Sequence, residues 1–144
     1  MEIINSEKKK VTPYDIAKTQ IGISESISPM KIEEYHKAAG IVADIRTSWC
    51  ASFISYCFEK SDYADIGIKN PWARAWSKVG IAIEDPSEGD LVVLTRGENQ
   101  GHVGFFVKYS EKPGFLSILS GNQDNMVKYK DYELSRVISF RKYL

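Results

Sequence analysis

The chain reads TSWCASF over residues 47–53 and GHVGF over residues 101–105. The first stretch leads into an apolar run that predicts a helix with Cys50 in its first turn. A helix N-terminus carries partial positive charge and free backbone N–H groups, and both stabilise a thiolate. The second stretch begins a predicted strand, and a histidine there can accept the thiol proton. Cys50 and His102 are therefore the candidate nucleophile and general base.

The other cysteine and the other histidine have simpler explanations. Cys57 lies in the middle of the same predicted helix between two aromatic residues, where we expect a small side chain in the core. Two helical turns, about 10 Å, separate it from Cys50, so we expect two thiols and no disulfide. His36 follows two glutamates in a polar segment, and we expect it to be solvated. The wide spacing of cysteines and histidines disfavours zinc, and we expect no metal or organic cofactor.

Composition sets the size and the charge of the protein. With 144 residues and 43% hydrophobic content, the chain can bury one core, and we expect a single domain over residues 1–144. Nineteen basic and nineteen acidic residues leave no net charge, so we expect no nucleic-acid partner. No apolar stretch approaches the roughly 20 residues that span a bilayer, so we expect no membrane insertion.

The first residues also carry expectations. Residues 1–7, MEIINSE, lack the hydrophobic segment of a signal peptide, so we expect synthesis in the cytoplasm without one. The KKK run at residues 8–10 is expected to be a solvated tail.

The chain divides into a helical half and a strand half near Pro86. Capping and stop signals predict helices over residues 13–20, 28–40 and 50–60, with Thr47 or Ser48 capping the third. A fourth helix is predicted from Asn70 to Gly80, with Trp72 and Trp76 on one buried stripe. About five strands follow, over residues 91–94, 102–108, 115–119, 126–129 and 136–141. Short turns between them favour antiparallel pairing, so the predicted class is α+β.

Five sequence blocks carry a family resemblance. In chain order they are WCASF (49–53), ARAW (73–76), EGDLVVL (88–94), GHVGF (101–105) and SGNQ (120–123). With this ordered set the chain resembles short bacterial and phage proteins of the NlpC/P60 and CHAP superfamily. These are papain-like cysteine peptidases and amidases that cut amide bonds in peptidoglycan. Residues 1–44 match the pattern less clearly.

The resemblance implies a papain-like fold in which the Cys50 helix packs on the antiparallel sheet and His102 faces the thiol. In such families a third polar residue on the next strand orients the imidazole, and Asn122 is the position that best matches it. An amide oxygen that accepts from the imidazole N–H would fix its tautomer. Gln123 and Asp124 are close enough in sequence to compete for this role.

The resemblance also implies a substrate, the stem peptide of peptidoglycan, cut between stem residues or at the link to the sugar. Trp49, beside the thiol, and Gln123 are the candidate substrate-binding residues. Without a signal peptide, the protein is expected to reach the wall by another export route, by injection or by lysis. A wall-remodelling enzyme, an injected toxin with an immunity protein, and a phage lysin all fit.

Two other classes of function remain open. A papain-like domain can become a binding or structural module, in which Cys50 would be a relic. The same nucleophile can also serve a cysteine amidase or transferase that acts on a protein or on a small amide.

Overall fold

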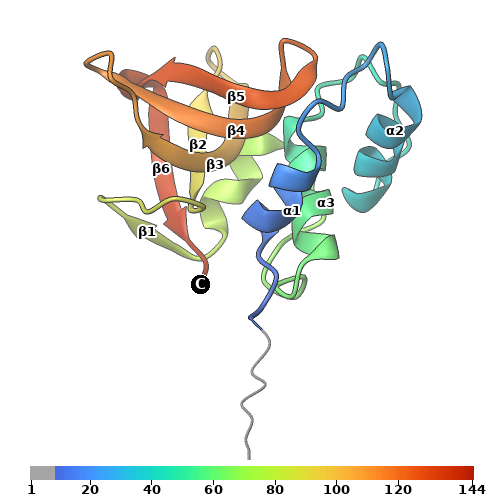
Figure 1. Cartoon of the computed structure of the whole chain (residues 1–144), viewed down its shortest axis with the longest axis horizontal. Helices are drawn as coiled ribbons and strands as arrows, with labels where there is room; N and C mark the ends of the chain where they lie inside the picture. The colour runs from blue at the N-terminus through green and yellow to red at the C-terminus, as the bar shows by residue number, and fades with distance from the viewer. Residues whose placement is uncertain (1–8) are drawn as a thin grey trace, which may run out of the picture.

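The structure, a computed structural model, describes residues 9–144 and has its α-helices in the N-terminal half and its strands in the C-terminal half (Figure 1). The elements, in chain order, are α1 (Pro13–Thr19), α2 (Pro29–Ala38), α3 (Cys50–Lys60), η1 (Ala73–Lys78), β1 (Ile81–Ile83), β2 (Leu91–Thr95), β3 (Gly101–Tyr109), β4 (Phe115–Gln123), β5 (Met126–Glu133), η2 (Leu134–Arg136) and β6 (Val137–Lys142). The predicted α+β class is confirmed. The expectations for residues 1–7 and Lys8 lie outside the described residues.

The strands form one sheet in the order β1-β6-β2-β3-β4-β5, and every neighbouring pair is antiparallel. Five of the strands were predicted from the sequence. The additional strand, β1, pairs with β6 at the edge of the sheet. Its three residues are mostly exposed and too few to show an alternating pattern, so the sequence carries no clear signal for it.

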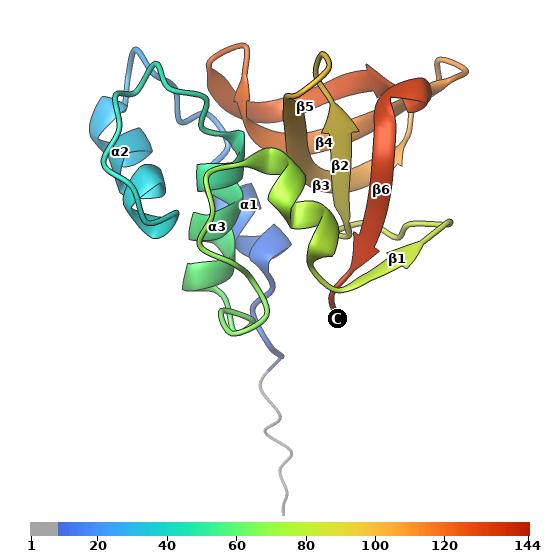
Figure 2. The same ribbon diagram turned by 180° about the vertical axis from the view of Figure 1, so that it is seen from behind.

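Helix α3 is the central helix of the fold. Every side chain from Cys50 to Phe58 is buried, because α1 and α2 cover one side of the helix and strands β3 and β4 cover the other (Figure 1). A helix that is apolar on nearly all sides is typical of such a position. Helix η1 packs between α3 and the strands β2, β3 and β6 (Figure 2). No helix in residues 9–144 has the length and apolar character needed to cross a bilayer.

Gly121 determines how closely the start of α3 approaches the sheet. A Cβ atom at this position would lie 2.5 Å from Cζ3 of Trp49 and 2.9 Å from Cβ of Phe53. Only glycine lets the two aromatic residues rest directly on the backbone of β4. Because Trp49 and Phe53 flank Cys50 in the sequence, this contact also places the thiol beside the start of β3, next to His102 and Val103.

The predicted fourth helix differs in type and in length. It is the 3-10 helix η1, and it begins at Ala73 rather than at Asn70. The Asn70 side chain instead accepts a hydrogen bond from the Trp72 backbone N–H at 2.8 Å, in a turn before the helix. Trp76 is fully buried, whereas Trp72 is 57% exposed, so the two rings do not share a buried stripe.

His36 is buried, and the prediction of a solvated side chain is wrong. Its Nδ1 lies 2.7 Å from the hydroxyl of Ser52, which links α2 to the first turns of α3. Its Nε2 has no hydrogen-bond partner among the described residues. Burial lowers the pKa of His36, and the backbone of Thr47 and Asp44 opposes the shift only in part.

We predict that this buried imidazole makes the protein less stable in acid. In the unfolded chain His36 takes up a proton near pH 6.5, whereas in the folded chain it does so only at a lower pH. The free energy of unfolding therefore falls as the pH drops below about 6.5. His36→Asn, which keeps a polar atom near Ser52, should flatten this dependence. Urea unfolding of both proteins between neutral pH and pH 5 measures it, and equal losses in the two proteins would refute the role of His36.

Candidate functional site

Cys50 is the first residue of α3. Trp49 occupies the N-cap position and provides no side-chain cap, so neither Thr47 nor Ser48 caps the helix as predicted. The first-turn N–H groups of a helix have no partner within the helix. With no side-chain cap in competition, these donors can stabilise negative charge at the start of α3.

The surroundings of Cys50 favour the thiolate. Burial raises its pKa, but the charge and hydrogen bond of His102, with the backbone groups of Val103 and Ala51, outweigh this and lower the pKa below that of an ordinary thiol. Cys57 lies two turns further along the same helix and has no such partners. Burial raises the pKa of Cys57 well above its usual range. One thiol is therefore activated and the other is part of the core.

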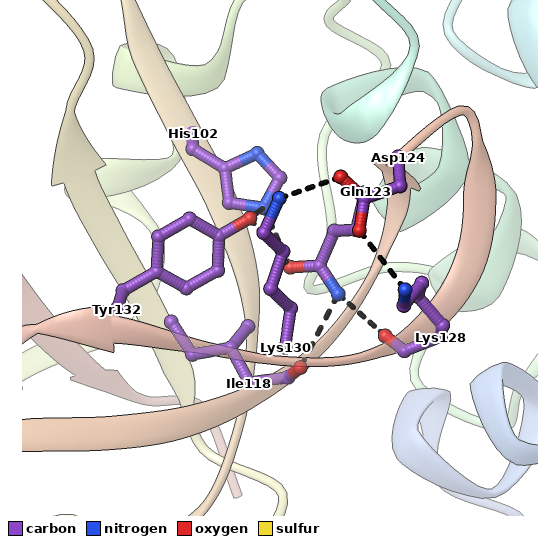
Figure 3. A network of polar contacts seen from close by, with 7 residues as sticks. All are labelled: His102, Ile118, Gln123, Asp124, Lys128, Lys130 and Tyr132. Atoms are coloured by element: carbon purple, nitrogen blue, oxygen red, sulfur yellow. Dashed lines mark hydrogen bonds and ion pairs between the residues drawn. The ribbon is translucent and has the colours of Figure 1, made fainter.

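Strand β3 carries His102, whose side chain is buried. Its Nε2 lies 2.9 Å from Oε1 of Gln123 and 3.2 Å from the hydroxyl of Tyr132. Figure 3 shows these three side chains pointing toward one another. The Tyr132 ring also packs against the imidazole, with ring centroids 5.1 Å apart. Since Nε2 is engaged on this side, Nδ1 is the nitrogen available to Cys50.

The Gln123 amide is oriented by its other contacts. Its NH2 group donates to the carbonyl oxygens of Ile118, at 3.3 Å, and of Lys128, so its Oε1 must point toward His102 (Figure 3). The Tyr132 hydroxyl donates to the same oxygen at 3.0 Å. An amide oxygen only accepts, so the imidazole proton resides on Nε2. The lone pair of Nδ1 is then free to take the thiol proton.

The structure corrects the prediction for Asn122. Its amide donates to the Ser48 hydroxyl at 3.4 Å and forms no hydrogen bond with His102. Asn122 adopts a left-handed conformation with φ 56°, and the β4–β5 register shifts between Ser120 and Gln123. This irregularity breaks the alternation of side chains along β4. Gln123 therefore takes the inward position.

Asp124, the other residue considered for orienting His102, does not hydrogen-bond to the imidazole either. Its carboxylate pairs with Lys130 at 2.8 Å and Lys128 at 2.9 Å. The two lysines lower the pKa of Asp124 to about 2. This ion-pair cluster is exposed, and each carboxylate oxygen of Asp124 pairs with a lysine and not with His102 (Figure 3).

A family model described as the CHAP domain matches residues 42–122. The chain belongs to the CHAP family. CHAP domains are generally hydrolases, namely amidases and peptidases, and peptidoglycan is the substrate associated with them. The match covers Cys50 and His102 and ends one residue before Gln123. No curated protein matches the chain.

The CHAP domain presents a different tryptophan to the cleft than the sequence predicted. Trp49 is fully buried: its indole N–H donates to Glu25 at 3.0 Å, and its ring stacks on Tyr35. Gln123 is also buried, so neither residue can line a substrate groove as predicted. Trp72 lines a hollow of about 220 Å³ together with Cys50. Its place in a turn ahead of η1, which exposes the ring, was not visible in the sequence.

Arg74 attaches the β2–β3 turn of the CHAP domain to η1. Its guanidinium donates to the backbone oxygens of Gly97, Glu98 and Gln100 and to the Thr95 hydroxyl, at 2.9–3.2 Å. This turn leads directly into Gly101 and His102. Arg74 is therefore a positioning residue for the start of β3. Across residues 9–144, no three His, Cys, Asp or Glu side chains are grouped to hold a metal ion.

We predict that a thiol reagent distinguishes the two cysteines. Because the pKa of Cys50 is lowered, a larger share of this thiol is ionised at a given pH than in an ordinary cysteine, whereas Cys57 is buried and its pKa is raised. Iodoacetamide should modify Cys50 faster than a free peptide cysteine at pH 7, and His102→Ala should remove this advantage. Peptide mapping by mass spectrometry identifies the modified residue. Modification of Cys57 first, or an unchanged rate in His102→Ala, would contradict the prediction.

Proposed function

We propose that this CHAP domain hydrolyses an amide bond in or next to the stem peptide of peptidoglycan, with Cys50 as nucleophile. The observation that carries the proposal is the orientation of His102, whose Nε2–H is held by Gln123 while Nδ1 remains available to the thiol. Family membership supports the reaction class and the substrate. The lowered pKa of Cys50 favours an active enzyme over a binding module that retains the cysteine as a relic.

In the first half of the reaction, the thiol proton passes to Nδ1 of His102, and the Cys50 sulfur attacks the amide carbonyl carbon. The backbone N–H of Cys50, at the uncapped start of α3, is a donor for the oxyanion that forms. The carbon–nitrogen bond then breaks as His102 returns the proton to the leaving amine. The products of this half are a free amine and a thioester on Cys50.

In the second half, His102 takes a proton from water, and the hydroxide attacks the thioester carbon. The carbon–sulfur bond breaks, the acid is released, and the proton returns to the sulfur or remains on the imidazole. Gln123 holds the ring through both halves, and Tyr132 closes the far side of Nε2. Neither half requires a metal or an organic cofactor.

Digestion of purified peptidoglycan tests this proposal. We expect the wild-type protein to release fragments with new amine termini and Cys50→Ala to release none, since the thiolate forms the covalent intermediate. Mass spectrometry of the fragments identifies the bond that is cut. If neither protein releases fragments while the wild type turns over a protein or a small amide, the substrate class is wrong.

Substitutions at adjacent positions test which amide orients His102. General-base catalysis contributes about 10²–10⁴-fold, so we expect Gln123→Ala, which frees the imidazole, to lower kcat at least about tenfold. Asn122→Ala should stay within a few-fold of the wild type, because its side chain donates a hydrogen bond to Ser48 and none to His102. Circular dichroism controls for folding. An equal loss in both variants, or a larger loss in Asn122→Ala, would return the role to Asn122.

A further inference from the structure

The cleft around Cys50 and His102 has two unlike ends. The hollow of about 220 Å³ on the Cys50 side includes the exposed ring of Trp72. A second hollow, of about 360 Å³, lies on the His102 side and is lined mainly by polar and charged side chains. Arg96 lines both hollows, so its side chain stands at their junction, beside the reacting groups.

The charged side chains of the second hollow are unequally neutralised. Its cations are Arg96, Lys130 and Arg136, and its anions are Asp124 and Asp131. Asp124 is occupied by its two lysines, and Asp131 accepts a hydrogen bond from the hydroxyl of Ser110. Neither arginine forms an ion pair with a carboxylate within the described part of the chain. Two guanidinium groups therefore face this hollow without an anionic partner.

The two arginines are held differently. Arg136 donates from Nε and Nη2 to the Thr95 carbonyl oxygen, both at 3.2 Å, and its guanidinium lies 5.2 Å from the centre of the Tyr132 ring. This leaves its Nη1 available. The Arg96 side chain is exposed and makes no hydrogen bond to any described residue.

Both arginines act electrostatically on Tyr132, which contacts His102. Burial raises the pKa of Tyr132, as does the nearby Cys50, while Arg136 and Arg96 act in the opposite direction. The Tyr132 hydroxyl lies 3.2 Å from Nε2 of His102. Because Arg136 lies against the Tyr132 ring and both arginines line the same hollow as His102, their positive charge is on the His102 side of the cleft.

We propose that Arg96 and Arg136 bind a free carboxylate of the substrate, located in the half that leaves as the amine. A planar guanidinium matches the two oxygens of a carboxylate better than any other side chain does. His102 must reach the leaving nitrogen to protonate it, so the amine half of the substrate lies over the His102 end of the cleft. This inference rests on the proposed function and adds a substrate feature, an acidic group beyond the scissile bond.

Substrates that differ only in charge test the position of the carboxylate. After the cut bond is identified, synthetic versions of that peptide carry carboxamides in the amine half alone or in the acyl half alone. We expect amidation of the amine half to lower kcat/KM about tenfold, which corresponds to the loss of one charged hydrogen-bonded contact. Equal rates for all versions, or a larger loss from amidation of the acyl half, would overturn the proposal.

The same substrates identify the arginine. In Arg96→Gln, the preference for the carboxylate form should shrink several-fold, because the guanidinium contributes to binding only when the anion is present. The matched control is Lys108→Gln, which removes an exposed positive charge from the same strand as His102 and from a residue that lines neither hollow. The control should keep the wild-type preference. An Arg96→Gln variant that keeps the full preference would refute the assignment.

A second measurement separates this proposal from the proposed function. Iodoacetate and iodoacetamide alkylate the same thiol, but only the first carries a carboxylate. The ratio of their rates at Cys50 should fall several-fold in Arg96→Gln and stay unchanged in Lys108→Gln. If peptidoglycan is not cut, the proposed function fails, and this ratio still decides the anion site. A ratio that Arg96→Gln leaves unchanged would overturn the site even if peptidoglycan is cut.

Discussion

The contact between α3 and the bare backbone of β4 at Gly121 is the constraint on which the site depends. Trp49 and Phe53 rest where any side chain on residue 121 would lie, so the start of the helix meets the sheet at backbone distance. Protein interiors are close-packed, so neither the helix nor the sheet could move to make room for a side chain at residue 121 without a loss of stability. Cys50, between these two aromatic residues, is therefore brought to the strand that carries His102. The nucleophile is positioned by packing, and its reactivity follows from that position.

The polar groups behind the thiol form a short network in which each atom has a defined role. Gln123 uses its NH2 group on two backbone carbonyls and presents its oxygen to His102 and Tyr132. Buried hydrogen bonds are strong when every member is satisfied, because the surrounding dielectric is low. The amide can then act as a carboxylate does in related triads, without placing a second charge near the imidazole. Among residues 9–144, Nε2 of His36 has no hydrogen-bond partner, so His36 is the less well satisfied of the two histidines.

The net charge of the chain does not describe the charge around its cleft. The chain carries equal numbers of acidic and basic residues, yet the lysines of the β5 region are committed to Asp124 while two arginines beside His102 are unpaired by carboxylates within residues 9–144. Charges act over about 10 Å at ordinary ionic strength, so local arrangement matters more than the sum. A neutral protein can thus present a cationic end to its cleft.

The sequence by itself determined the helix that begins at Cys50, the strand of His102 and the antiparallel sheet, since turn signals and apolar periodicity act over a few residues. The CHAP resemblance rested on the same short blocks. Only the tertiary structure decided that Gln123 and not Asn122 meets the imidazole, and that Trp72 and not Trp49 faces the cleft. The first depends on a left-handed residue and a register shift, since one residue of shift turns a side chain to the other face. The second depends on burial of Trp49 by helices and strands distant in the sequence.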